Sequence, residues 1–377
     1  MKEIYLDNAA TTRVCPEAAA AAMKMMTENY GNPSSTHTRG REAAKVLKES
    51  RAKLAAALGC GAESVYFTSC GSEGDNWAII NGAKYMARRG KHIISSTVEH
   101  DAVRKSMDEL ERQGFEITRL APDSTGAIPV SAVEGALRPD TVLVSLMMVN
   151  NETGAVTDIA GAARAIKKAS SAALFHTDAV QGFMKVPFSA KTLGADMITV
   201  SGHKIHAPKG VGALYIRPGL KLPPYIMGGG QESGMRAGTE PMPQIAAFAA
   251  AAELAFAAMT ESTEKMSGLR ARAKEEISAA IPGAVFIGGG APHILSVSLP
   301  GWRSEVLMNF LEAGGIYVSR SSACKKGGRS HVLEAMGLRP DIIDGAIRVS
   351  LSRYTGADEI DAFCAALKEA HDTLAHN

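Results

Sequence analysis

The sequence predicts an α/β protein with a mostly parallel central sheet and a second, smaller α+β domain. Two observations support this prediction. Short β-rich runs alternate with helical segments between residues 64 and 216, which is the pattern of strands joined by crossover helices. Within this part, residues 141–149 form a near-continuous apolar run, as expected of a central strand covered on both faces.

The elements follow in chain order. Helices are predicted over 16–29 and 38–58, and Gly59 ends the second because glycine readily adopts the left-handed conformation that closes a helix. Strands are predicted over 64–68, 92–95, 115–120, 141–149, 172–176, 197–200 and 212–216, and helices reaching Arg89 and Gln113 separate the first three. A helical region at 241–280 precedes strands at 293–299 and 347–351 and helices at 304–313 and from Ala357 onward. We therefore expect a large domain over 15–260 and a small one formed by 1–14 with 261–377.

Composition narrows the class of protein. The 377 residues are 46% hydrophobic, enough for two buried cores. Lys and Arg total 41 against 39 for Asp and Glu, and this net charge of +2 gives no broad attraction to nucleic acid or an anionic membrane. The first residues, MKEIYLDNAATT, contain no apolar signal region, and the longest apolar stretch, 245–259, is shorter than the roughly 20 residues of a membrane span. We expect a cytoplasmic protein without direct membrane or nucleic-acid contact.

The five cysteines are odd in number, widely spaced and without a CxxC pair, which argues against a disulfide framework and a zinc site. We expect no metal site. Cys324 precedes two lysines and two glycines: the ammonium groups favour its thiolate, and the glycines allow its segment to move. It is therefore the candidate nucleophile. A structural role is expected for the others, which are Cys15, Cys60, Cys70 and Cys364.

Two polar segments, HTDAVQ (176–181) and SGHKIHAPKG (201–210), each follow a predicted strand. Ligand sites in open α/β sheets lie at the carboxyl ends of strands. A lysine there can form a Schiff base with a pyridine cofactor if a carboxylate keeps the ring nitrogen protonated. Lys204 and Asp178 suit these two roles. Alone, each would more often be a surface charge, a turn residue or a helix cap, so the inference depends on further motifs.

Ten segments in order complete the pattern: YLDNAATT (5–12), YGNPSSTHTRGREA (30–43), FTSCGSEGDN (67–76), EHDAV (99–103), NNETG (150–154), HTDAVQ, SGHKIHAPKG, GGGQESGMRAGT (228–239), SSAC (321–324) and IRVSL (347–351). Together they resemble the cysteine desulfurases of the class V aminotransferase group, in their NifS/IscS-like branch. These are pyridoxal-phosphate enzymes of fold type I, and the resemblance covers nearly the whole chain.

The resemblance implies a catalytic set around the cofactor. Pyridoxal 5'-phosphate would form its Schiff base with Lys204, Asp178 would face the ring nitrogen, and Gln181 would contact the ring hydroxyl. His100 would stack on the ring and move protons. A neutral imidazole can do both, since it has an aromatic face and titrates near neutral pH.

The cofactor phosphate would bind where FTSCGSEGDN turns from strand into helix, because free backbone N–H groups and the helix dipole favour an anion there. Gly71 and Ser72 match the family's contacts at this turn, and Cys70 lies beside it. Ser201 and His203 match further phosphate ligands. Thr239 matches a ligand that the family supplies from the second subunit. The resemblance thus implies a homodimer with shared active sites, whose phosphate ligands are Gly71, Ser72, Ser201, His203 and Thr239.

For substrate, Arg348 matches the residue that binds the carboxylate of L-cysteine, a geometry that suits a bidentate arginine. An arginine inside an apolar strand also requires a partner for its charge. Asn151 matches a residue beside both cofactor and substrate. The implied reaction converts L-cysteine to L-alanine and leaves the sulfur as a persulfide on Cys324. A protein acceptor, either an iron–sulfur scaffold or a sulfur carrier for thiolated tRNA and cofactors, would then receive it.

Three alternatives remain at this point. A selenocysteine lyase or an aminotransferase of the same fold would leave Cys324 incidental. A catalytically silent interaction protein would keep the fold alone, although the complete set of predicted site residues argues against that. Nucleotide binding through GGGQESG is disfavoured, because the chain lacks a GxxxxGK[ST] loop.

Overall fold

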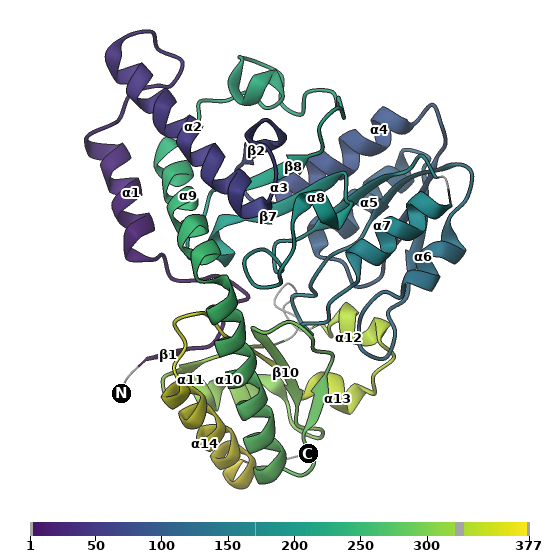
Figure 1. Ribbon diagram of the computed structural model, residues 1–377. Coiled ribbons are helices and arrows are strands. Elements are labelled where there is room, and N and C mark those ends of the chain that lie inside the picture. Colours follow the sequence, from purple (N-terminus) through teal and green to yellow (C-terminus); the bar gives the residue numbers. More distant parts are fainter. Residues whose placement is uncertain (1–2, 170, 321–327, 375–377) are drawn as a thin grey trace.

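The computed structural model describes residues 3–169, 171–320 and 328–374. Figure 1 shows a large region built around a twisted sheet and a smaller region below it, joined by a long helix. The α/β architecture expected from the sequence is present. Cys324 lies outside the described residues.

Within the described residues, the large sheet has seven strands, and the strand β8 is antiparallel to both of its neighbours while the other pairs are parallel. In spatial order the strands are β2 (Val65–Thr68), β8 (Gly212–Ile216), β7 (Met197–Ser201), β6 (Leu174–Asp178), β5 (Thr141–Ser145), β3 (His92–Ser96) and β4 (Glu116–Leu120). Most of these strands are buried along their whole length, because helices cover both faces.

Two hydrophobic cores lie on the two faces of this sheet. On one face pack α2 (Thr38–Leu58), α6 (Val130–Ala136), α7 (Ile159–Lys168), α8 (Ala190–Leu193) and α9 (Met242–Ala257). On the other face pack α3 (Gly71–Asn76), the π-helical turn η2 (Trp77–Asn81), α4 (Gly82–Met86) and α5 (Asp101–Arg112). Helix α1 (Pro16–Thr27) lies beside α9 at the left of Figure 1.

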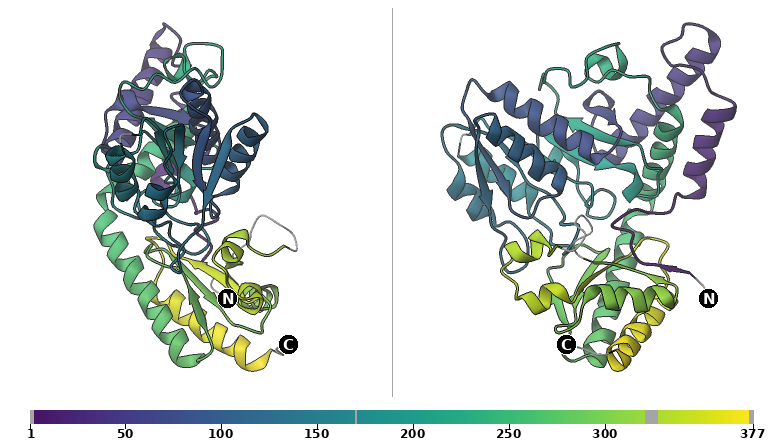
Figure 2. Two further views of the ribbon diagram at one scale, coloured as in Figure 1. Left: turned by 90° about the vertical axis from the view of Figure 1, so that its right-hand side faces the viewer. Right: turned by 180° about the vertical axis from the view of Figure 1, so that it is seen from behind.

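The helical region expected at 241–280 is two helices. Helix α9 ends at Ala257, and α10 (Met259–Ala280) starts after a single residue with the chain bent by 73°. Helix α10 leads from the large region into the small one (Figure 2). No single helix among the described residues is long and apolar enough to cross a membrane; this bent pair meets the criteria by length and composition only.

The small region contains, within the described residues, a four-stranded antiparallel sheet in the order β12 (Ser319–Arg320), β13 (Ala346–Ser350), β10 (Ile294–Ser298) and β9 (Val285–Ile287). Its own core includes residues of α10, α11 (Ser304–Ala313) and α14 (Ala357–Thr373). Short helices α12 (His331–Ala335) and α13 (Pro340–Asp344) form a further cluster. The strand β1 (Ile4–Tyr5) pairs in parallel with β11 (Ile316–Tyr317), so the N-terminal segment returns to this region.

The sequence predicts one continuous strand over the apolar run 141–149, but the strand in the structure is shorter. Strand β5 ends at Ser145, although the next residues stay buried. Their backbone still follows β6, since Leu146 N–H donates to His176 O at 3.1 Å and Met148 N–H to Asp178 O at 2.9 Å. An apolar run indicates that a segment is buried, but it does not distinguish a buried strand from a buried loop.

Candidate active site

A cavity of about 310 Å³ opens at the carboxyl ends of β6 and β7, the position that sheet topology favours for a ligand. We call it the front cavity. Its lining is Ala9, Ala10, Cys70, Gly71, Ser72, Asp75, His100, Met147, Val149, Asn151, Asp178, Val180, Gln181, Ser201, His203, Lys204 and Arg348. Every predicted site residue that the structure describes is here except Thr239, which is exposed and outside the lining.

Lys204 enters the front cavity from the short 3-10 turn η3 (Gly202–Lys204), directly after β7. Its Nζ donates hydrogen bonds to Ala9 O at 2.5 Å and to Ala10 O at 2.7 Å. These carbonyls belong to YLDNAATT (5–12), the first of the ten segments that carry the family resemblance. The N-terminal segment therefore holds the amine of Lys204, which is the predicted attachment point of the cofactor.

Asp178 is the last residue of β6, and one carboxylate oxygen accepts from Val180 N–H at 2.8 Å. Burial raises the pKa of this carboxyl, and the nearby charges of His100 and Lys204 oppose the rise. His100 caps α5, where its Nδ1 accepts from Ala102 N–H at 3.2 Å. That contact leaves Nε2 as the ring nitrogen that can exchange a proton with a ligand.

Asp75 is a site residue that the sequence did not predict. One carboxylate oxygen each of Asp75 and Asp178 and a ring nitrogen of His100 lie within 4.8 Å of one another, a grouping that would also fit a metal ion. Burial, followed by the charge of Asp178, raises the pKa of Asp75 well above its usual range, so this carboxyl keeps its proton. A signal was available, because Asp75 is four residues after Gly71 on one helical face.

The phosphate side of the front cavity has little room and polar atoms without partners. A Cβ at Gly71 would come within 2.7 Å of Val180 Cγ2, so a larger residue would displace that wall. Ser201 Oγ is buried without a hydrogen-bond partner in the described part of the chain. Burial, helped by Lys204, lowers the pKa of His203 to about 4, and this neutral ring shares a hydrogen bond with Thr11 Oγ1 at 3.2 Å.

Gln181 and Arg348 are both held by hydrogen bonds to residues that are distant from them in the sequence. Gln181 donates its amide to Ala9 O at 2.8 Å and faces His293 Nε2 with its amide oxygen at 3.3 Å. Arg348 donates to Asp7 Oδ1 at 2.7 Å and to Asn151 O at 2.8 Å, while its Nε is buried without a partner in the described part of the chain. The buried arginine thus has the carboxylate partner that its position demands, and three of its five N–H donors stay outside these two hydrogen bonds.

A smaller cavity of about 30 Å³ lies behind Lys204, large enough for a water molecule. We call it the rear cavity; its lining is Thr12, Met184, Lys185, Lys204, Ile205, His206, Ala255, Ser262, Met266, Leu351, Ser352 and Arg353. Lys185 is 6% exposed and its Nζ has no hydrogen-bond partner among the described residues. Burial, followed by the charge of Lys204, lowers the pKa of Lys185 to about 7.

The described cysteines differ in setting. Burial raises the pKa of Cys60 to about 11 and that of Cys364 to about 12, so both thiols stay protonated near neutral pH. Cys15 is buried under the large sheet. Cys70 lines the front cavity beside Gly71, in line with its expected place near the turn.

Comparison with known proteins shows the family. The model of the family "Aminotransferase class-V" matches residues 4–363. The chain belongs to this family. "Cysteine desulfurase 2" of Trichormus variabilis is 44% identical over 96% of this chain and 91% of its own length. The resemblance to cysteine desulfurases found in the sequence is therefore confirmed.

Solved structures agree on the fold. A structure described as a NifS-like protein superposes with a TM-score of 0.93 at 38% identity, covering 99% of this chain and all of that one. Another, described as SspA in complex with cysteine, has a TM-score of 0.81 at 30% identity and covers 94% of this chain and 100% of that one. The predicted fold class, an α/β class V aminotransferase fold, is confirmed.

Proposed function

We propose that this protein is a pyridoxal-phosphate-dependent cysteine desulfurase that converts L-cysteine to L-alanine and passes the sulfur to an acceptor protein. One observation carries the proposal: the amine of Lys204 shares a cavity with a buried carboxyl, an imidazole and a buried arginine. This combination suits amino-acid chemistry on a pyridine cofactor. Family membership and the names of the relatives support the same reaction.

The front cavity fits pyridoxal phosphate by the chemistry of its donors. Lys204 would hold the aldehyde carbon, Asp178 the ring nitrogen and Gln181 the ring hydroxyl, while His100 would lie on the ring face. The unpartnered Ser201 hydroxyl would donate to the phosphate, together with Ser72 and neutral His203. When bound, the cofactor supplies an electron sink that stabilises negative charge next to the amino-acid nitrogen.

The chain's own groups would orient the substrate and move its protons. Arg348 is fixed by Asp7 and by the carbonyl of Asn151, so its guanidinium is already oriented when the carboxylate of L-cysteine arrives. The side chain of Asn151 would lie beside cofactor and substrate. Lys204 and the Nε2 of His100 would carry protons between substrate atoms, since both line one cavity.

Cys324 would take the sulfur. Its thiolate would attack the substrate sulfur, and the carbon–sulfur electron pair would return to the carbon skeleton, which then leaves as alanine after protonation. The persulfide on Cys324 would pass to an iron–sulfur scaffold or a sulfur carrier in the cytoplasm. Cys324 is outside the described residues, so the chemistry of its sequence neighbours and the family resemblance carry this assignment.

Thr239 would complete the phosphate site of a partner subunit in a homodimer. The segment that carries it is fixed to the large region by two ion pairs, Arg51 with Glu232 and Arg236 with Glu73, at 2.6 Å and 2.8 Å. Within this anchored segment Thr239 is exposed. A fixed and outward-facing threonine suits donation to a neighbouring copy.

Mass spectrometry with an alanine assay tests the function. Protein incubated with pyridoxal phosphate and L-cysteine should release alanine and gain one sulfur mapped to Cys324. Cys324→Ala should lose both, whereas Cys60→Ala should retain both because its thiol stays protonated. Alanine release by Cys324→Ala at the parent rate would refute the persulfide step and favour another reaction of this fold; a matched assay with selenocysteine separates the lyase alternative.

A further inference from the structure

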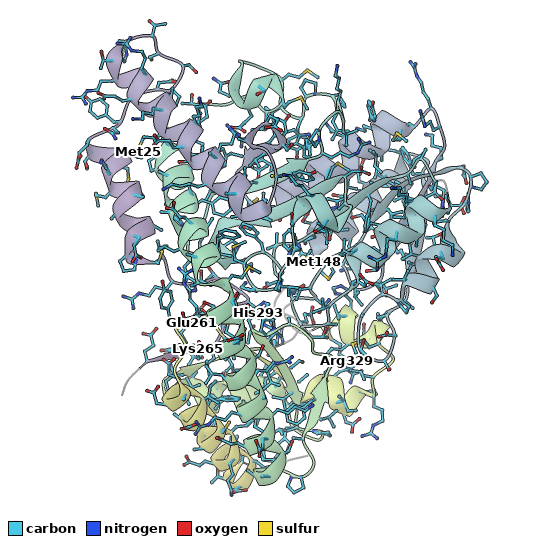
Figure 3. All side chains as sticks on the ribbon, in the orientation of Figure 1. Met25, Met148, Glu261, Lys265, His293 and Arg329 are labelled. Atoms are coloured by element: carbon cyan, nitrogen blue, oxygen red, sulfur yellow. The ribbon has the colours of Figure 1, made fainter. Side chains whose placement is uncertain are left out.

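His293 is a buried histidine outside the front-cavity lining, and its ring contacts a residue of that lining. It directly precedes β10 in the small region. Figure 3 labels it near the centre of the molecule, where the region of the large sheet meets α10. Its Nε2 lies 3.3 Å from the amide oxygen of Gln181, across 112 positions of the sequence. The small region therefore contacts the side chain that is predicted to bind the ring hydroxyl of the cofactor.

The carbonyl of Ala9 determines which way the Gln181 amide points. A carbonyl oxygen can only accept hydrogen bonds, and Ala9 O accepts from Gln181 Nε2 at 2.8 Å and from Lys204 Nζ at 2.5 Å. A flipped amide would place its oxygen against Ala9 O, where two acceptors would repel each other. The amide oxygen of Gln181 is therefore the atom that faces His293. It follows that the Nε2 of His293 carries a proton and donates this hydrogen bond.

His293 can donate in this way as a neutral ring. Burial, followed by the charge of Lys185 and then that of Arg348, lowers the pKa of His293 well below its usual range. A neutral imidazole has one N–H, which here is on Nε2, so Nδ1 is an acceptor. Nδ1 is buried without a hydrogen-bond partner among residues 3–169, 171–320 and 328–374. In this part of the chain, the hydrogen bond to Gln181 is thus the one that the ring makes.

A packing role alone does not explain a histidine at this position. A buried Nδ1 without a partner costs free energy that an apolar side chain of similar size would avoid. His92, a buried histidine of the large sheet, shows the contrast, because its two ring nitrogens bond the hydroxyls of Thr141 and Thr118 at 2.8 Å each. The hydrogen bond to Gln181 accounts for the polar ring of His293.

The orientation of Gln181 matters because its amide nitrogen has a second proton. One proton is used by Ala9 O, and Gln181 lines the front cavity, so the other is available to a ligand there. The last torsion of a glutamine side chain is broad, so a single hydrogen bond at Nε2 leaves the amide free to rotate. The bond from His293 holds the oxygen end as well. With both ends held, the amide presents a donor to the cavity.

We propose that His293 is a positioning residue, which holds the Gln181 amide so that it donates to the ring hydroxyl oxygen of pyridoxal phosphate. This inference rests on the proposed function, because it takes that cofactor as the ligand of the front cavity. A donor at the ring oxygen favours the ionised form of that oxygen. Without the bond from His293, the amide could turn its oxygen to the cofactor, which would favour the protonated form.

The absorbance of the bound cofactor, recorded without substrate, tests this role. Protein loaded with pyridoxal phosphate is titrated with pH, and the midpoint of the absorbance change is measured. His293→Leu should raise the midpoint by about one pH unit, because a hydrogen bond to a charged oxygen is lost. His293→Gln supplies an N–H at a similar reach from the backbone and should restore the parent midpoint.

His92→Leu is the matched control. It also removes a buried imidazole, but the ring bonds threonines outside the front-cavity lining. This variant should keep the parent midpoint even if it lowers the thermal stability. His293→Met takes the place of His293→Leu if that variant folds poorly, since it too lacks a donor.

A double-mutant cycle tests whether His293 acts through Gln181. In a Gln181→Leu background, His293→Leu should shift the midpoint no further. A full additional shift in that background overturns the inference, as does a parent midpoint in His293→Leu; both results leave the proposed function intact. A parent protein that binds no pyridoxal phosphate would instead refute the proposed function, and this inference with it.

Discussion

The front and rear cavities meet at Lys204 and share strong burial, yet burial has opposite chemical results in them. In the front cavity it raises the pKa of Asp75 well above its usual range, and it raises the pKa of Asp178 against the opposing charges of His100 and Lys204. Around the rear cavity it lowers the pKa of Lys185 to about 7 and that of His206 to about 4. Low dielectric disfavours charge of either sign.

This difference shows that burial shifts the pKa values of acids and bases in opposite directions within one buried region. Carboxyls with raised pKa values lie on one side of Lys204, and bases with lowered pKa values lie on the other. Lys185 and Arg353 line the rear cavity together with Lys204, and no Asp or Glu is part of that lining. The reactive amine therefore lies at the boundary between the two settings.

The largest effect should come from the shared residue itself. Lys204→Ala should lower alanine formation from L-cysteine by about 10²–10⁴-fold or more, because the proton-transfer group and the cofactor attachment are both lost. Steady-state assay of alanine measures it. Lys209→Ala, at an exposed lysine five residues away, is the control and should form alanine at the parent rate. A Lys204→Ala variant that forms alanine at the parent rate would show that Lys204 is not the reactive amine.

Lys185→Met should sharpen the account of the rear cavity through its pH dependence. The folded-state pKa of about 7 is below the unfolded value of about 10.5, so the charged lysine destabilises the fold fully below pH 7. This penalty fades as pH rises from 7 to 10.5. We expect the variant to be more stable than the parent by about 2–4 kcal/mol at pH 6, with the gain vanishing near pH 10.

Urea unfolding at pH 6, 8 and 10 measures this gain in cofactor-saturated protein. Lys191→Met, at an exposed lysine, should show no pH-dependent gain. A Lys185→Met variant that is destabilised equally at all three values would show that Lys185 is held in its charged form by a contact of its own.

Arg348→Met tests the substrate side of the front cavity. The loss of two charged hydrogen bonds to a carboxylate should raise the KM for L-cysteine about ten- to a hundredfold. Arg348→Lys keeps the positive charge but loses the planar guanidinium, so its KM should lie between that of the parent and that of Arg348→Met. If kcat drops while KM is unchanged in both variants, Arg348 does not bind the substrate carboxylate.

The smallest effect is expected for Asp75→Asn. Because Asp75 already holds a proton, its amide is a close mimic, and alanine formation at pH 7 should change less than about threefold. Asp178→Asn is the informative partner, since it removes the carboxylate assigned to the ring nitrogen and should cost far more. Equal losses in the two variants would show that Asp75 is ionised, contrary to the front-cavity description.

The sequence predicted the architecture and much of the site because both depend on local pattern. Apolar runs between turns predicted the strands of the large sheet. The break at Ala258 was not predicted, because a bend at one residue leaves the composition of a helical region unchanged. Asp178 was found because it ends a buried strand, and Lys204 because it lies in the turn directly after one. Their roles remain predictions, as do those of Thr239 and Cys324.

By itself, then, the sequence determined the family, the order of the elements and the residue types available for chemistry. Only the tertiary structure decided how those residues are held and charged. Arg348 pairs with Asp7 across 341 positions, and Lys204 binds Ala9 O across 195. Such contacts, and the burial that shifts the pKa of Lys185, arise when distant segments meet, and no local spacing records that meeting.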